Sequence, residues 1–195
     1  MSPHLTPRLA LVATCVAGLL LSGCATLNEQ ECRSADWRAI GQADGRQGRA
    51  MDRLDEHRKA CAEHGVTPNA DRYWLGRSEG LQSYCQLDNA LRVGRAGQAY
   101  LGVCPPQIDP AFRRFHAATY EVWRLRSAVD GVDNEIDQHE RSLRQSGLSD
   151  RERSRIRQAI RELDRRRDRL RDDLNDQERR VDRLMQDWRQ GVLIR

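Results

Sequence analysis

Three residues with metal-ligating side chains, His57, Cys61 and His64, follow one another at intervals of four and three residues. On a helix this spacing brings the two imidazoles and the thiolate to one face, and zinc accepts both kinds of ligand. Cys61, however, has three potential disulfide partners, and a disulfide sulfur is a poor metal ligand. Neither histidine has a matching acidic or histidine pair elsewhere. We therefore predict no metal site, with His57 and His64 as the candidates if one exists.

Cys24 is predicted to undergo a different covalent chemistry. The uncharged apolar run from Leu9 to Leu21 is short for a membrane span, which needs about 20 apolar residues, and is typical of a signal-peptide core. The following Leu21-Ser22-Gly23-Cys24 resembles the lipobox of bacterial lipoproteins, whose cysteine is acylated, with palmitate among the acyl chains, and becomes the first residue after cleavage. The alternative is a secretory signal without lipid. Residues 1–23 are therefore predicted to be removed, and two or three acyl chains would anchor the chain stably.

Ala25 follows the predicted anchor cysteine. In lipoproteins of this kind an aspartate at that position often signals retention in the inner membrane. Its absence favours a location in the cell envelope on the outer membrane, facing the periplasm.

Four cysteines remain after Cys15 leaves with the signal peptide and Cys24 is acylated: Cys32, Cys61, Cys85 and Cys104. Four cysteines in a short exported segment indicate two disulfides, for which three pairings are possible. Sequential pairing closes the shortest loops, so we favour Cys32–Cys61 and Cys85–Cys104. Each bridge would stabilise the segment by about 3 kcal/mol.

Other chemistry finds little support in the sequence. There is no Gly-x-Ser-x-Gly motif, and the paired cysteines leave no free thiol for nucleophilic catalysis. Asp172 and Asp173 fall on an exposed helical face, and the glycines of residues 40–48 lack the strand and lysine of a phosphate loop. The net charge of +4 becomes +3 once Arg8 is removed, and acids and bases alternate, which argues against nucleic acid. We predict a protein that is not an enzyme and has no cofactor.

Two regions would position these residues, and the composition changes between them near Pro105-Pro106. Residues 24–106 form the cysteine-containing module. Glycine in a helix costs about 1 kcal/mol relative to alanine, so a repeated pattern of glycines predicts close helix contacts or positive φ angles. Loop glycines are the alternative. Short helices are predicted over residues 52–64 and about 71–84. The repeated glycines are Gly41, Gly45 and Gly48, then Gly76 and Gly80, then Gly94 and Gly97.

Residues 107–195 are predicted to form a long helical hairpin. Its first arm carries an a/d seam of apolar residues that is polar only at His139. Gly147 ends this arm, and the capping box Ser149–Glu152 begins the second. Arg167 and Gln177 interrupt the second seam. The seams are Val122, Leu125, Val129, Val132, Ile136, His139 and Leu143, and then Ile156, Ile160, Leu163, Leu170, Leu174, Val181, Leu184 and Trp188.

The second arm is longer than the first, so its far end must contact the cysteine module or another chain. Its arginine runs have acids beside them, as in residues 164–168, which predicts a solvated, salt-bridged surface. Binding of anionic lipid or nucleic acid is the alternative for such a helix.

The module resembles a known family over roughly residues 24–115. The resemblance is carried by Ile40-Gly41-x-x-Asp44-Gly45-x-x-Gly48, by His57-Arg58-x-Ala60-Cys61-x-x-His64-Gly65-Val66-x-Pro68, by Tyr73-x-x-Gly76-Arg77-x-Glu79-Gly80-Leu81-x-x-Tyr84-Cys85, and by Gly94-x-x-Gly97-x-x-Tyr100-x-Gly102-Val103-Cys104-Pro105. These motifs are similar to those of the proteobacterial lipoproteins grouped as domain of unknown function twenty-seven ninety-nine. The resemblance implies an exported lipoprotein and no particular activity.

The sequence thus predicts a mainly α protein, with a small disulfide-linked, glycine-rich helical module followed by a coiled-coil hairpin. We expect a non-catalytic envelope lipoprotein, anchored to the membrane by its lipid, that binds a protein partner or a second copy through the coiled coil. The alternative is a small ligand- or metal-binding periplasmic module in which the hairpin is a spacer.

Overall fold

The computed structural model describes residues 26–191, and all the regular structure in that range is helical. The mainly α fold predicted from the sequence is therefore confirmed. The predicted signal peptide and Cys24 lie outside the described residues, in which no helix combines the length and apolar character of a membrane span. The helices are α1 (Glu29–Arg33), α2 (Trp37–Arg46), α3 (Arg53–Ala62), α4 (Ala70–Tyr84), α5 (Leu87–Arg95), α6 (Asp109–Leu143) and α7 (Asp150–Arg189).

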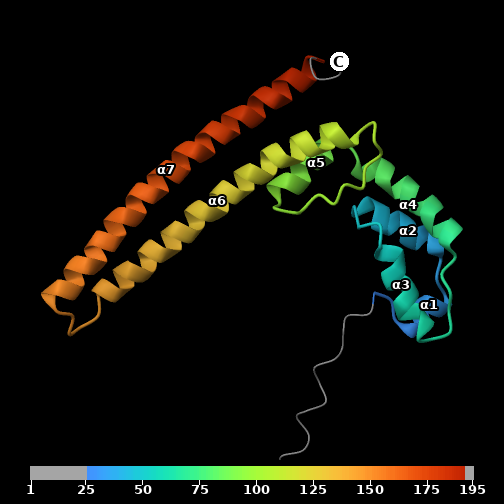
Figure 1. Ribbon diagram of the computed structural model, residues 1–195, viewed down its shortest axis with the longest axis horizontal. Helices are drawn as coiled ribbons and strands as arrows, with labels where there is room; N and C mark the ends of the chain where they lie inside the picture. Colours follow the sequence, from blue (N-terminus) through green and yellow to red (C-terminus); the bar gives the residue numbers. More distant parts are fainter. Residues whose placement is uncertain (1–25, 192–195) are drawn as a thin grey trace, which may run out of the picture.

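Helices α2 and α4 pack through their glycines, and we call them the first glycine-packed pair (Figure 1). A Cβ atom added at Gly45 would lie 2.3 Å from the Arg77 carbonyl oxygen, and one at Gly80 would lie 2.2 Å from that of Gln42. Both distances are shorter than any real contact of this kind. The prediction that these glycines bring two helix backbones together is therefore confirmed.

Helices α5 and α6 form the second glycine-packed pair, in which a Cβ atom at Gly94 would lie 2.1 Å from Thr119 Oγ1. The turn after α5 has the same backbone conformation as the turn after α2. Gly48 and Gly97 each have a φ angle in the left-handed region, +63° and +67° respectively, and each comes three residues after the helix glycine. A Cβ atom there would enter an aromatic ring of the partner helix, Tyr84 in the first pair and Trp123 in the second.

The correspondence extends to hydrogen bonds and disulfides. The Arg77 guanidinium donates to the Arg49 carbonyl oxygen over 2.8 Å, and a ring nitrogen of His116 lies 2.7 Å from the Gln98 carbonyl oxygen. Arg49 and Gln98 each follow the left-handed glycine of their turn. In both pairs a disulfide joins the segment before the short helix to the segment before the long one.

The disulfides are Cys32–Cys61 and Cys85–Cys104, the pairing that the sequence favoured. The weak repeat seen in the sequence is thus a structural repeat of two helix pairs, with α3 inserted into the first.

The long hairpin consists of α6 and α7, packed side by side (Figure 1). Its predicted capping box is present, with Ser149 and Glu152 bonded reciprocally, and Gly147 has a φ angle of +87°. The buried seam residues of α6 are Val122, Leu125, Val129, Val132 and Ile136. The predicted first arm, its seam and the restart of the second helix therefore agree with the structure.

The far end of α7 packs back onto the disulfide module. Leu184 belongs to a buried core that includes Cys85 and Cys104, and the Trp188 ring lies edge-on to Phe115 with 5.6 Å between centroids. Of the two contacts expected for the longer arm, the structure shows the one within the chain.

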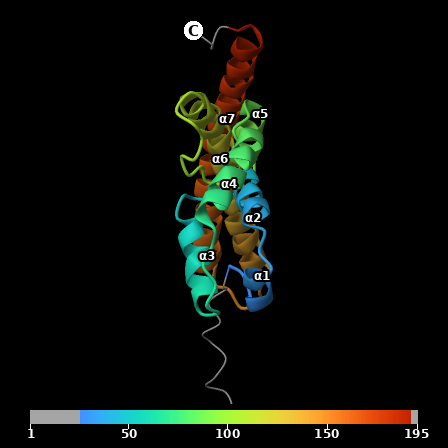
Figure 2. The same cartoon turned by 90° about the vertical axis from the view of Figure 1, so that its right-hand side faces the viewer.

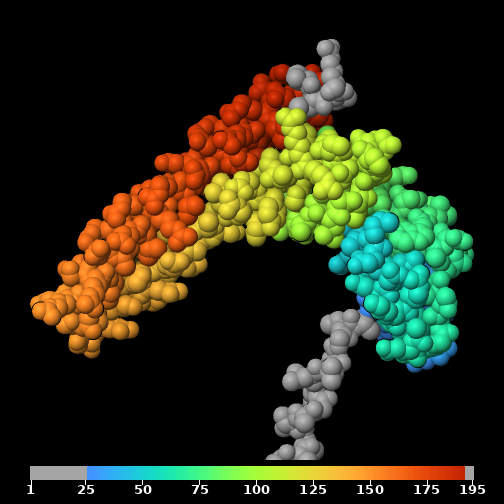
Figure 3. Space-filling view, in the orientation of Figure 1, coloured from blue at the N-terminus to red at the C-terminus, as the bar shows by residue number. Residues whose placement is uncertain are grey.

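The buried residues of the described chain form two cores. One contains residues of α5, α6 and α7, and Leu81 and Tyr84 at the end of α4 belong to it as well. The other lies within the first glycine-packed pair, around Cys61 and Tyr73. The first glycine-packed pair and the hairpin give the molecule an arched outline (Figure 3), and the molecule is narrow in the view turned by 90° (Figure 2).

Candidate functional site

One cluster of ionisable side chains is deeply buried in the first glycine-packed pair. Asp44, His57 and Tyr73 are 6%, 2% and 0% exposed. Asp44 Oδ2 accepts a hydrogen bond of 2.8 Å from the Tyr73 hydroxyl and lies 2.9 Å from His57 Nε2. Because an ionised carboxylate can only accept, Nε2 is the donor of the second bond. One carboxylate oxygen therefore joins side chains from α2, α3 and α4.

Each member of this cluster is positioned by local sequence. Asp44 precedes the notch glycine Gly45, so its side chain lies beside the contact between α2 and α4. His57 lies one turn before Cys61, whose disulfide fixes α3 against α1. The Thr26 hydroxyl lies 2.8 Å from His57 Nδ1, so both ring nitrogens of the histidine have partners.

The electrostatics of the cluster favour an ionised Asp44. Burial raises the pKa of its carboxyl, but hydrogen bonds from His57 and Tyr73 and the positive charges of His57 and Arg53 outweigh burial, so this pKa lies below its ordinary value. The Arg53 side chain contributes from 3.8 Å. Burial, together with the bond to Asp44, raises the pKa of Tyr73. The hydroxyl thus keeps its proton and remains a donor.

The three side chains form a closed structural network. The Tyr73 hydroxyl proton and both His57 ring nitrogens are occupied within the chain, and the ring of Tyr73 is fully buried. A general base must reach a substrate proton within hydrogen-bond distance. The arrangement stabilises the contact between three helices and offers no substrate-facing atom at Tyr73.

The candidate zinc ligands do not converge. Cys61 is bonded to Cys32, His57 is held by Asp44 and Thr26, and His64 Nδ1 lies 4.0 Å from a carboxylate oxygen of Glu29. Across residues 26–191 no group of three or more histidine, cysteine or acidic side chains is arranged to hold a metal ion. The spacing of these three residues instead places the disulfide of Cys61 between a buried imidazole, that of His57, and a half-buried one, that of His64.

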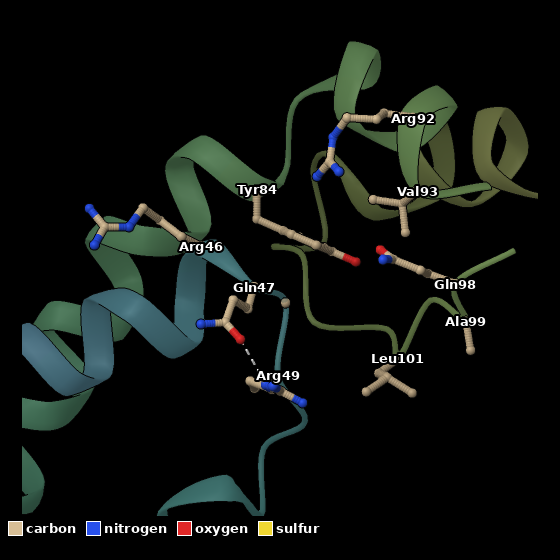
Figure 4. A pocket seen from close by; sticks show the side chains of 10 residues that line it. Arg46, Gln47, Arg49, Tyr84, Arg92, Val93, Gln98, Ala99 and Leu101 are labelled. Atoms are coloured by element: carbon tan, nitrogen blue, oxygen red, sulfur yellow. Dashed lines mark hydrogen bonds between the residues drawn. The ribbon is translucent and has the colours of Figure 1, made fainter. Parts of the chain in front are cut away.

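A separate cavity of about 410 Å³ lies where the two glycine-packed pairs meet (Figure 4). The turn that ends α2 forms one wall and the turn that ends α5 forms another. Arg49 and Gln98, the corresponding residues of those turns, both line it. The sequence alone does not reveal this cavity, because its walls come from segments about 50 residues apart. Its lining residues include Arg46, Arg49, Tyr84, Arg92, Val93 and Gln98.

Comparison with known families decides the affiliation of this region. Residues 36–121 match the family described as Protein of unknown function (DUF2799). The chain carries a DUF2799 domain. The resemblance seen in the sequence is therefore confirmed. Neither a curated protein nor a solved structure matches the chain in these comparisons.

The DUF2799 match extends past the compositional boundary to residue 121 and covers α2, α4, α5 and the first part of α6. It ends two residues before Trp123, whose ring lies against Gly97. The DUF2799 domain thus contains most of both glycine-packed pairs.

The sequence motifs of the DUF2799 domain contained Asp44 and Tyr73, but neither was recognised as part of a site. The position of Asp44 next to Gly45 could have indicated the site. A carboxylate at a close contact between two helices is buried, and it then needs hydrogen-bond donors from its neighbours.

The surface of α7 beyond the DUF2799 domain is salt-bridged in part, as predicted. Arg167 pairs with Asp164 and Asp168 of its own helix, and Arg167 and Arg171 pair with Asp133 of α6. Seven exposed arginines of α7 outside the seam form no ion pair with any described residue, and we call them the basic band. They are Arg151, Arg155, Arg157, Arg161, Arg165, Arg166 and Arg169.

Proposed function

We propose that this protein is a lipid-anchored envelope protein that acts without catalysis and presents the basic band of α7 to an acidic protein partner in the periplasm. The observation that carries the proposal is the contrast between paired and unpaired arginines on one helix. The lipid anchor and the periplasmic location rest on the lipobox-like sequence at Cys24 and on the two disulfides, which persist in oxidising compartments.

The positions of the basic band support binding rather than simple solvation. Arg157, Arg161, Arg165 and Arg169 follow one another at intervals of four, so like charges are neighbours along the helix. Each such pair destabilises a helix by roughly 0.2–0.5 kcal/mol. From Arg151 to Arg169 the helix rises about 27 Å, at about 1.5 Å per residue. An acidic surface of that length would relieve the repulsion and pair the guanidinium groups.

The chemistry of the band favours an acidic protein over a membrane surface or a second copy. A helix that lies on a membrane has apolar residues beside its basic face. Here the apolar residues of α7, among them Ile156 and Ile160, lie on the seam toward α6, and polar Ser154 and Gln158 lie between the arginines. A second copy would bring two basic bands together.

The absence of catalysis is supported by the closed network of Asp44, His57 and Tyr73, whose polar atoms are used within the chain. The disulfides also occupy the four cysteines of the module. No observation favours the alternative metal-binding function over this proposal.

In-cell photocrosslinking tests the proposal. A photoreactive residue in place of Gln158, between the arginines of the band, should give a discrete adduct with an acidic envelope protein. The triple variant Arg157→Glu, Arg161→Glu and Arg165→Glu should abolish the adduct, because the band would then repel its partner. The matched variant with lysine at the same three positions retains the charge and should keep the adduct.

Three outcomes would contradict the proposal: an adduct that survives the glutamate variant, an adduct between two copies of this chain, or an adduct with lipid only. A photoreactive residue at Arg72 on exposed α4 provides the control for random contacts, and its adducts should differ from those at Gln158.

A further inference from the structure

The cavity between the two glycine-packed pairs is lined by the hydroxyl group of a tyrosine whose ring is largely buried. Tyr84 as a whole is 5% exposed. Its side chain points into the cavity (Figure 4). Gly48 makes room for the ring, since a Cβ atom there would lie 2.2 Å from it. A hydroxyl directed into the cavity can donate a hydrogen bond to a bound ligand.

Cationic side chains surround this hydroxyl. Arg92 extends toward Tyr84 from α5, Arg49 lies across the cavity, and Arg46 extends outward at the rim (Figure 4). None of the three forms an ion pair with a described residue: Arg92 donates to the side-chain oxygen of Asn89 and Arg49 to that of Gln47. No described carboxylate therefore neutralises the positive charge of these arginines.

The helix dipoles oppose an anion here, but they are outweighed. Helices α2 and α5 both end at the cavity, and each C-terminus contributes about half a negative charge. The guanidinium groups of Arg49 and Arg92 carry a full positive charge each, so roughly one positive charge remains. Carbonyl oxygens of the α2 turn also accept hydrogen bonds within the chain: that of Gly45 from the Gly48 amide, and that of Arg49 from the Arg77 guanidinium.

The geometry points to a specific ligand chemistry. We propose that this cavity binds a phosphate group carried by a small organic molecule or a lipid headgroup. Arg49, Arg92 and the Tyr84 hydroxyl approach from different sides, which suits a tetrahedral oxyanion better than a planar carboxylate. The volume of about 410 Å³ exceeds that of a bare oxyanion, and Val93 and Leu101 supply an apolar wall for the rest of the molecule.

The proposal predicts a defined pattern of binding by the whole protein, purified in a neutral detergent. In calorimetric titrations glycerol 3-phosphate should bind, and Arg49→Gln and Arg92→Gln should each weaken binding by about tenfold or more, since each removes a charge-assisted hydrogen bond. Tyr84→Phe, which keeps the buried ring, should weaken it by about threefold to tenfold. Arg114→Gln removes an equal charge from an exposed arginine of α6 that lies outside the cavity, and it should leave binding unchanged.

Three further probes identify the source of the phosphate. Inorganic phosphate that binds as tightly as glycerol 3-phosphate would support a site for the group alone. Binding to phosphatidylglycerol vesicles but not phosphatidylcholine vesicles, lost in Arg49→Gln and Arg92→Gln, would support a headgroup. Acetate should bind more weakly than either phosphate.

The proposal would be overturned if no phosphate probe bound, if acetate bound equally well, or if Arg114→Gln reduced binding as much as Arg92→Gln. Circular dichroism of each variant establishes that it is folded. None of these variants alters the basic band of α7, so the result does not depend on the proposed protein partner.

Discussion

The two glycine-packed pairs share a backbone arrangement but differ in the chemistry of their cores. Tyr73 and Tyr84 are eleven residues apart in α4, as are Phe112 and Trp123 in α6. The residue before the notch glycine is Asp44 in the first pair and Val93 in the second. The second pair packs without a buried carboxylate at this position, which shows that the fold does not require one. The polar network is therefore a feature that the first pair adds to a common scaffold.

The comparison also explains the roles of the glycines. The first pair has glycine on both helices, whereas in α6 the positions of Gly76 and Gly80 are occupied by Phe115 and Thr119. In the first pair a Cβ atom added at a notch glycine meets only backbone atoms, whereas at Gly94 it would meet the Thr119 hydroxyl as well as the backbone of α6. Added volume at a notch glycine of the first pair would therefore require a backbone to move.

The largest expected effect is therefore at the glycine contact of the first pair. Gly80→Ala should destabilise the protein by about 4 kcal/mol or more, because its Cβ atom would lie 2.2 Å from a backbone oxygen of α2. Gly131→Ala in α6 is the matched control. Nothing lies within 4 Å of a Cβ atom there, so helix propensity should make this variant more stable by up to about 1 kcal/mol. Urea denaturation measures both, and equal effects would contradict the close-contact interpretation.

The disulfides should affect the two pairs almost equally. The bridges close loops with sequence separations of 29 and 19 residues. Loop closure depends only on the logarithm of loop length, so removing either bridge should cost about 3 kcal/mol. Denaturation of Cys32→Ala with Cys61→Ala, compared with Cys85→Ala and Cys104→Ala, measures the two losses. A difference above about 2 kcal/mol would show that one bridge acts through more than the unfolded chain.

Sequence reasoning succeeded where the determinants of structure are local. The capping box at Ser149 and the left-handed glycines Gly65 and Gly147 fixed helix ends, and the spacing of Val122 to Ile136 indicated the seam. These features involve neighbours along the chain, so pattern and propensity suffice to identify them.

Long-range relations were less accessible from sequence. The partners of Asp44 come from 13 and 29 residues away, and the likeness of α6 to α4 was hidden because glycines had been replaced by Phe115 and Thr119. The cavity and the unpaired basic band also depend on which surfaces meet. Composition reveals the presence of these residues but not their partners.

Asp44 and Tyr73 of the first pair can be replaced by the residue types found at the corresponding positions of the second pair, valine and phenylalanine. Asp44→Val should cost about 2 kcal/mol, because it leaves the buried donors of Tyr73 and His57 without an acceptor. Adding Tyr73→Phe removes one of these donors, so the double variant should be more stable than the sum of the single effects predicts, by about 1 kcal/mol. Urea denaturation of the four proteins measures the coupling. Additivity within about 0.3 kcal/mol would indicate that Asp44 and Tyr73 act independently.

The smallest expected effect is a dependence of stability on pH that only the first pair should show. The folded-state pKa of Asp44 lies below its ordinary value, so its contribution to stability is present above about pH 4 and is lost as the pH falls through the folded pKa. The stability difference between the natural protein and Asp44→Asn should shrink as the pH falls below about pH 4. Val93→Ala, at the corresponding buried position, removes no titratable group, so its difference from the natural protein should not vary over the same range. A difference for Asp44→Asn that persists at about pH 2 would mean that packing, rather than the charge on this carboxylate, joins the three helices.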